Sequence, residues 1–177
     1  MDTGHPPRWQ SWGALLRISL LPSALADVCC GLWLAGAWPF RWAALPAFGA
    51  SLLIYHGGMA LNDWRDREID RPLRPGRPLV SGALAPRAAL GAALFGLLGG
   101  PALAALGGPL PALVWALVAA TAALYDLWAP ARASSPLWLG LCRAGNLLAA
   151  AAFGANLGSG SEPFGPGSLA PWAALLY

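Results

Sequence analysis

Four of the chain's eight acidic residues lie in one short stretch, Asp63 to Asp70. If this stretch is helical, one narrow face carries four polar side chains. They lie at roughly 0°, 40°, 80° and 100° around the helix axis and belong, in that order, to Asn62, Asp66, Asp70 and Asp63. Glu68 lies at about 240° and points away. Three carboxylates on one helix face repel each other unless a cation lies between them. The spacing therefore predicts a site for a hard divalent cation with oxygen ligands.

Magnesium is the cation that best suits this set of ligands. It typically takes one or two carboxylates and leaves its other positions to water and substrate phosphates. We therefore predict that Asp63, Asp66 and Asp70 are the catalytic and metal-binding residues, and that Mg²⁺ bridges them to a diphosphate. The alternative is a solvated helix end, in which Arg65 and Arg67 pair with these acids.

A basic, proline-rich loop follows the acidic stretch. Pro72 is expected to break the helix, and the residues around it present Arg71, Arg74 and Arg77. Guanidinium groups suit phosphate oxygens, because they donate paired N–H groups in a fixed plane. Acids with a metal ion on one side and arginines on the other would hold a diphosphate and stabilise it as a leaving group. We predict that these arginines and Asn62 bind substrate.

Composition indicates that the elements carrying these residues are membrane spans. Apolar residues make up 57% of the chain and charged residues 11%, against roughly a quarter charged in ordinary globular domains. Ionisable groups at a membrane boundary are costly and usually functional, which favours the metal site over the solvated helix end. Cys29, Cys30 and Cys142 form no metal-binding or disulfide pattern and are expected to be free thiols.

Hydropathy predicts five spans, because a helix needs about 20 apolar residues to cross a bilayer. They cover residues 14–37, 42–61, 88–106, 110–127 and 137–157. A sixth apolar run, residues 169–177, is too short to cross. We therefore expect an all-α, polytopic transmembrane bundle with five spans and the start of a sixth. Residues 1–177 would form a single membrane-embedded domain that is incomplete at its C-terminus.

The distribution of arginine predicts an orientation. If the N-terminus is cytoplasmic, one loop arginine, Arg41, falls on the outer side. The arginines on the inner side are Arg8, Arg65, Arg67, Arg71, Arg74, Arg77, Arg87 and Arg132. Such a positive-inside bias places the acidic stretch at the cytoplasmic face, in the inner membrane of a bacterial cell. The net charge of +3 gives no reason to expect nucleic acid as a partner.

These motifs resemble the UbiA family of membrane prenyltransferases. The family's first aspartate-rich motif, NDxxDxxxD, is matched by Asn62, Asp63, Asp66 and Asp70, and its basic loop ending RPLxSG is matched from Arg77 to Gly82. The acidic stretch is locally most similar to the chlorophyll-synthase branch. The resemblance implies Mg²⁺-dependent transfer of an isoprenyl group from a prenyl diphosphate to an aromatic or other lipophilic acceptor.

Polar residues inside other spans extend the resemblance. Arg17 and Asp27 resemble cavity-facing residues of the family's first helix, although Arg17 could instead extend to the membrane interface. A pattern that runs from a Tyr-Asp pair ending at Asp126 to Arg143 and Asn146 is similar to an EboC-like subgroup. Arg143 and Asn146 share a helix face, and Asp126 or the diphosphate could partner Arg143. All five are predicted to bind substrate.

Two alternatives remain beside the prenyltransferase interpretation. The family normally has nine helices and a second aspartate motif, often DxxxD, and this sequence contains no second copy. A non-catalytic lipid-binding or transport component, built on a degenerate UbiA scaffold, would also fit. A CDP-alcohol phosphotransferase would need a glycine directly after an aspartate, in the form DGxxAR, but Trp64 follows Asp63.

Overall fold

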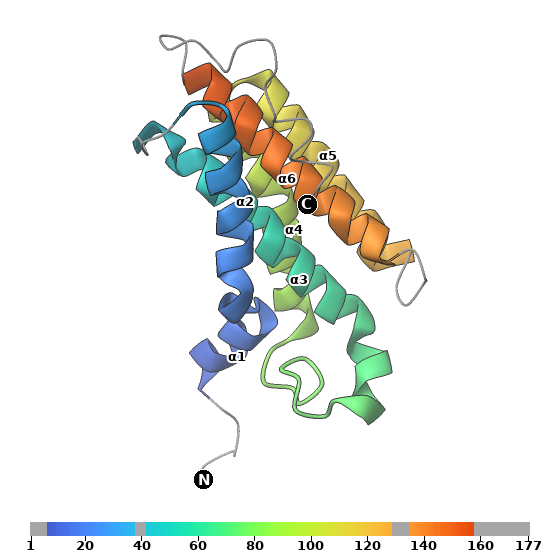
Figure 1. Ribbon diagram of the computed structural model, residues 1–177. Helices are drawn as coiled ribbons and strands as arrows, with labels where there is room; N and C mark the ends of the chain where they lie inside the picture. The colour runs from blue at the N-terminus through green and yellow to red at the C-terminus, as the bar shows by residue number, and fades with distance from the viewer. Residues whose placement is uncertain (1–6, 38–41, 129–134, 158–177) are drawn as a thin grey trace.

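The computed structural model describes residues 7–37, 42–128 and 135–157, and over these ranges the chain is helical, without strands (Figure 1). The helices are α1 (Arg8–Leu15), η1 (Ile18–Leu20), α2 (Leu21–Leu34), η2 (Trp42–Ala44), α3 (Leu45–Leu73), α4 (Pro86–Ala104), η3 (Ala105–Gly107), α5 (Pro109–Trp128) and α6 (Ser135–Leu157). The all-α bundle predicted from the sequence is confirmed. The short apolar run at residues 169–177 lies outside the described residues.

Four helices are long and apolar enough to cross a membrane, and the count becomes five if the bent pair Arg8–Leu15 and Ile18–Leu34 crosses as one span. The bent pair differs from the predicted span, since residues 14–37 do not form one continuous helix. The chain turns by 47° between Arg8–Leu15 and Ile18–Leu34. Arg17 has a φ of 49° at the break, in the left-handed region that interrupts a right-handed helix. The bend directs Arg17 towards α3.

Helix α3 is longer than the predicted span, because it continues past Leu61 through the acidic stretch to Leu73. Pro72 lies inside this helix, which ends one residue later at Leu73, so the predicted break at Pro72 is one residue too early. Proline lacks one N–H donor, a small loss in a final turn that is about to end. The backbone N–H of Arg74 still bonds to the carbonyl of Asp70 at 2.7 Å. The helix therefore carries the acids on regular geometry up to its end.

The most extensive helix contact in the bundle is between α3 and α4, and glycine makes it close. A Cβ built on Gly96 would lie 2.3 Å from the carbonyl oxygen of Leu53 and 2.7 Å from the Cα of Gly57. Such distances exclude any side chain, as in the small-residue interfaces of membrane helices. The contact fixes α3 against α4, and with it the end of α3 that carries the acids.

The remaining helices pack around α3. Helix α6 lies against both α2 and α5, and Trp115 and Phe153 are fully buried where α5 and α6 meet. Large apolar side chains, such as Phe95 and Leu98 on α4, are about 70% exposed, as expected of a surface facing lipid. In Figure 1 the N-terminal helix and the α3–α4 loop lie at the same end of the bundle. The acidic motif therefore lies at that end.

Candidate active site

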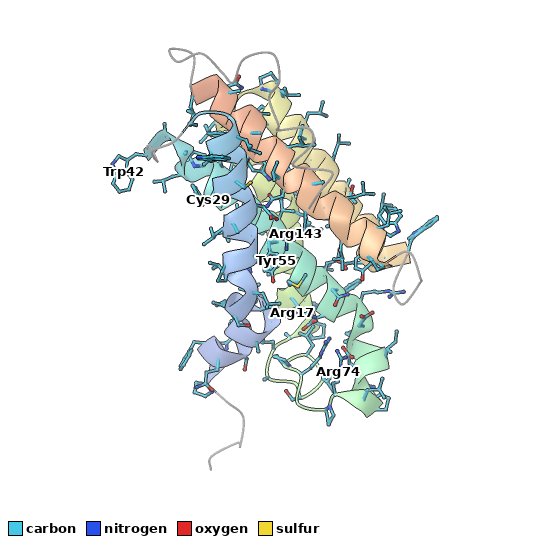
Figure 2. The ribbon with its side chains drawn as sticks, viewed as in Figure 1. Arg17, Cys29, Trp42, Tyr55, Arg74 and Arg143 are labelled. Carbon is cyan, nitrogen blue, oxygen red and sulfur yellow. The ribbon has the colours of Figure 1, made fainter. Side chains whose placement is uncertain are left out.

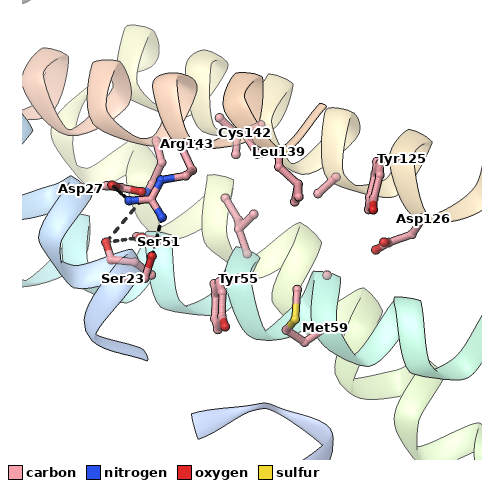
Figure 3. A pocket seen from close by; sticks show the side chains of 16 residues that line it. Ser23, Asp27, Ser51, Tyr55, Met59, Tyr125, Asp126, Leu139, Cys142 and Arg143 are labelled. Atoms are coloured by element: carbon pink, nitrogen blue, oxygen red, sulfur yellow. Dashed lines mark hydrogen bonds and ion pairs between the residues drawn. The ribbon is translucent and has the colours of Figure 1, made fainter. Parts of the chain in front are cut away.

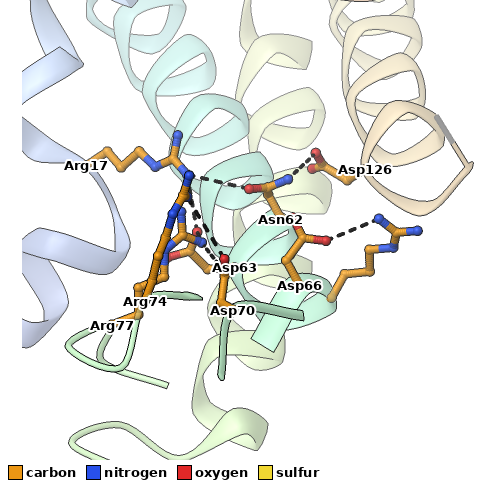
Figure 4. A network of polar contacts seen from close by, with 9 residues as sticks. Arg17, Asn62, Asp63, Asp66, Asp70, Arg74, Arg77 and Asp126 are labelled. Atoms are coloured by element: carbon orange, nitrogen blue, oxygen red, sulfur yellow. Dashed lines mark hydrogen bonds and ion pairs between the residues drawn. The ribbon is translucent and has the colours of Figure 1, made fainter. Parts of the chain in front are cut away.

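The acids of α3 divide into a buried pair and two outer residues. Asp63 and Asp70 are each 6% exposed, and both accept hydrogen bonds from Nη1 of Arg77 (Figure 4). The bond to Asp63 Oδ1 measures 3.0 Å. Asp66 instead pairs with Nη1 of Arg65 at 3.1 Å, and Glu68 faces outward, as the helical angles predicted. The structure thus brings Asp63 and Asp70 to one point.

Arginines from two separate segments meet at this point. Arg17 comes from the break before η1, and its Nη2 lies 3.3 Å from Asp63 Oδ1 and 3.5 Å from Asn62 Oδ1. Arg17 therefore turns to the acids of α3. Arg77 belongs to the α3–α4 loop, which is anchored by the buried side chains of Leu79 and Leu84. Two guanidinium groups thus flank one carboxylate pair.

The other two loop arginines lie further out. Arg74 is 62% exposed and reaches Asp70 only at 4.0 Å, while Arg71 is 69% exposed and pairs with Glu68 at 3.0 Å. Figure 2 shows Arg74 at the same end of the bundle as Arg17. Both side chains are mostly exposed, and their predicted role in binding substrate stays a prediction.

The carboxylates fit a divalent cation that is shared with a phosphate. No three His, Cys, Asp or Glu side chains among the described residues lie close enough together to hold a metal ion by themselves. However, Asp63 and Asp70 converge on one cationic nitrogen, that of Arg77, so their oxygens already face a common positive charge. Two carboxylates are the usual protein contribution to a magnesium site. Asp66 as a third ligand stays a prediction.

Asn62 connects this site to a second carboxylate. Its amide nitrogen, Nδ2, donates to Oδ1 of Asp126 at 3.4 Å, while its Oδ1 accepts from Arg17 (Figure 4). Asp126 lies near the end of α5 and is 4% exposed. One amide thus links two segments that are 64 residues apart in the chain.

A cavity of about 290 Å³ lies between α2, α3, α5 and α6, next to Asp126 (Figure 3). Most of its lining is apolar or aromatic and includes Ile54, Tyr55, Met59, Val118, Ala122 and Leu139. Polar side chains gather at its two ends. Asp126 stands at one end, and Asp27 and Arg143 stand at the other (Figure 3). Such an apolar space with a few polar groups is typical of a small-molecule site.

At the far end, Arg143 ties α6 to α2. Its Nη2 lies 2.9 Å from Asp27 Oδ1, and its Nη1 donates to Oγ of Ser23 at 2.5 Å. The partner of Arg143 is therefore Asp27, and Asp126, which the sequence suggested for this role, bonds to Asn62. Asn146 shares the face of Arg143, as predicted, and accepts a hydrogen bond from Trp115 at 2.9 Å.

Sequence reasoning missed two members of these networks. Ser23 precedes Asp27 by four residues, so both lie on one helix face, and that spacing could have identified it. Trp115 donates to Asn146, and a buried amide in an apolar span does require such a partner. The sequence could not specify Trp115 as that partner, because several tryptophans occur along the chain.

Comparison with known proteins assigns the chain to a family. Residues 24–177 match the model of the UbiA prenyltransferase family. A digeranylgeranylglyceryl phosphate synthase of Methanothrix thermoacetophila is 60% identical over 43 residues, which is 24% of this chain and 16% of that protein. Another, from Halobacterium salinarum strain NRC-1, is 43% identical over 76 residues, which is 42% of this chain and 28% of that protein.

A solved structure of a digeranylgeranylglyceryl phosphate synthase has the same fold. It superposes with a TM-score of 0.74 at 20% identity, over 81% of this chain and 52% of the other. This chain thus spans about half the length of that protein. The family match covers most of the chain, including the acidic motif, the cavity residues other than Ser23, and helices α3 to α6. The chain belongs to the UbiA prenyltransferase family.

Proposed function

We propose that the protein transfers an isoprenyl group from a prenyl diphosphate to a lipophilic acceptor within a bilayer, in a Mg²⁺-dependent reaction. The observation that carries this proposal is the convergence of two buried carboxylates, Asp63 and Asp70, with Arg17 and Arg77 beside an apolar cavity. A helix bundle that only spans a membrane would not be expected to gather four charged groups at one point, because each charge costs free energy in a membrane.

Each group has a defined task in this reaction. Asp63 and Asp70 would hold the magnesium ion, which would draw charge from the diphosphate oxygens. Arg17 and Arg77 both lie at Asp63, so they can bind phosphate oxygens and offset the charge of the departing diphosphate. The lining of the cavity excludes water from the reacting carbon and favours an apolar chain.

The size of the cavity limits what it can hold. About 290 Å³ is at the small end of the range for ligand pockets, roughly 300–1,000 Å³. The cavity would hold the reacting ends of the two substrates, and the rest of a prenyl chain would lie among the apolar helix faces. The relatives are named for a product with two geranylgeranyl groups, so geranylgeranyl diphosphate is the first donor to test.

We also propose that the acidic motif faces the cytoplasm, in the inner membrane of a bacterial cell. The arginines of α3 and of the following loop lie at the end of the bundle where the N-terminal helix also lies (Figure 1). Positive residues concentrate on the cytoplasmic side of membrane proteins. Prenyl diphosphates are charged, so a site at this face can take them from the cytoplasm.

The test is release of diphosphate from geranylgeranyl diphosphate, in membranes that contain the protein expressed from its full reading frame. Release should require Mg²⁺ and should stop when EDTA is added. Asp63→Asn should lower the rate about 100-fold, because one of two ligand carboxylates is lost. The matched control is Glu68→Gln, which removes an exposed acid of the same helix. It should keep the wild-type rate.

Two results would overturn the proposal. One is release that is indifferent to EDTA or to Asp63→Asn. The other is saturable binding of geranylgeranyl diphosphate without any release, which would instead indicate the lipid-binding scaffold considered from the sequence.

A further inference from the structure

Asp126 differs from the other buried aspartates in its partners. Asp27, Asp63 and Asp70 each form an ion pair with an arginine. Asp126 is equally buried, at 4% exposure, but its bond within the described ranges is the one from Asn62 Nδ2 at 3.4 Å. A carboxylate held by a single neutral donor keeps lone pairs for another partner.

The space beside Asp126 opens into the cavity. Asp126 lines this cavity, and Figure 3 shows its carboxylate at the end opposite Arg143. Gly58 lies across from it on α3, where a built Cβ would stand 3.9 Å from Asp126 Oδ2 and 3.8 Å from the Cβ of Ala122. Gly58 carries no side chain, so that position adds only backbone beside the carboxylate. Because Asp126 lines the cavity, a ligand in the cavity can contact its carboxylate.

Asn62 fixes the carboxylate relative to the diphosphate site. Its side chain accepts from Arg17 and donates to Asp126, so a single amide connects the group that would bind diphosphate to the group that faces the cavity. Asp63 follows directly in the sequence. Asp126 therefore lies at the boundary where a donor's leaving group and an acceptor's nucleophile would meet.

We propose that Asp126 is a catalytic residue that accepts a hydrogen bond from the acceptor's hydroxyl group and takes its proton, which makes the acceptor an alcohol or a phenol. This assignment rests on the proposed prenyl transfer. The bond between C1 of the prenyl group and the diphosphate oxygen breaks, and its electron pair leaves with the diphosphate. A lone pair of the acceptor oxygen forms the new C1–O bond, and the proton of that oxygen moves to Asp126.

The other polar groups of the cavity suit this task less well. Asp27 is engaged by Arg143, in the cluster that also includes Ser23. That cluster stands near Ser51, about 16 Å along α3 from Asn62 at 1.5 Å per residue. It is therefore remote from the diphosphate site, whereas Asp126 is one hydrogen bond from Asn62.

The experiment separates donor binding from transfer in Asp126→Asn. Membranes with the full protein are given Mg²⁺ and geranylgeranyl diphosphate, with geranylgeranylglyceryl phosphate as an alcohol acceptor and, in parallel, a lipophilic phenol. We expect donor affinity to stay within about threefold of wild type and ether formation to fall about 100-fold, as for loss of a general base. Asp126→Glu should recover part of the rate. Thr121→Ala, on the same helix but outside the cavity lining, is the control and should match wild type.

Each other outcome counts against a defined statement. The assignment is overturned if the Asp126→Asn protein forms the ether at the wild-type rate. It is also overturned if that protein loses donor binding by as much as it loses transfer. Wild-type protein that releases diphosphate but alkylates neither the alcohol nor the phenol overturns the hydroxyl acceptor. Wild-type protein that releases no diphosphate overturns the proposed function, and the role of Asp126 with it.

Discussion

Arg143 and Asp27 form the ion pair between α6 and α2, and its removal tests the packing of the bundle. The two side chains differ in exposure, since that of Asp27 is 4% exposed and that of Arg143 is 37% exposed. Arg143→Leu leaves a buried carboxylate without its cation. Asp27→Asn leaves a guanidinium that still donates to Oγ of Ser23 and can donate to the new amide oxygen as well. The first change should therefore cost more stability than the second.

The magnitudes follow from the burial of the group that stays behind. Removing one partner of a buried ion pair costs roughly 3–5 kcal/mol, and we expect about 3 kcal/mol for Arg143→Leu. The guanidinium left by Asp27→Asn keeps hydrogen-bond acceptors, so this change should cost about 1–2 kcal/mol. Replacing both residues by leucine removes both charges and should return the free energy of unfolding to within about 1 kcal/mol of wild type.

The assay is reversible unfolding in mixed micelles titrated with SDS and followed by tryptophan fluorescence. Arg87→Leu, which removes an exposed arginine at the start of α4, controls for charge and should change stability by less than about 0.5 kcal/mol. The reasoning is refuted if both single variants cost less than the control range. It is also refuted if the double variant loses as much free energy of unfolding as the two single variants lose together.

Two further predictions concern the helix contacts. Gly96→Ala should lower the free energy of unfolding by about 1–3 kcal/mol, because its Cβ would meet the Leu53 carbonyl oxygen at 2.3 Å. Gly91→Ala on the same helix has open space around it and should be neutral or slightly stabilising. Equal effects of the two variants in the micelle titration would contradict the close contact. Trp115→Phe should cost at least about 2 kcal/mol, since it leaves Asn146 Oδ1 without its buried donor, and a variant as stable as wild type in the same titration would show that this bond contributes nothing.

The helices and the acidic face were predictable because they depend on local patterns. Apolar runs of about 20 residues set the spans, and regular helical angles turned Glu68 away from Asp63 and Asp70. The structure has the same arrangement, because α3 stays helical through this stretch. The break at Arg17 was missed, because no apolar pattern indicates its left-handed backbone.

The partners of the charged residues were not predictable in the same way. Arg143 pairs with Asp27 across 116 residues, Arg17 with Asp63 across 46, and Asn62 with Asp126 across 64. From the sequence, the predicted partner of Arg143 was Asp126 or the diphosphate. Asp27 takes that place because α6 packs against α2, and a side chain pairs with whichever group the folded helices bring within about 4 Å.

The sequence by itself therefore determined which residues carry charge into the membrane and which of them share a face, since both follow from hydropathy and the helical repeat. The tertiary structure alone decided that Asp63 and Asp70 meet at Arg77, and that Asp126 is held by an amide at the edge of a cavity. The physical reason is that a helix fixes neighbours three and four residues apart. Contacts between helices depend on how whole surfaces pack, down to single glycines such as Gly96.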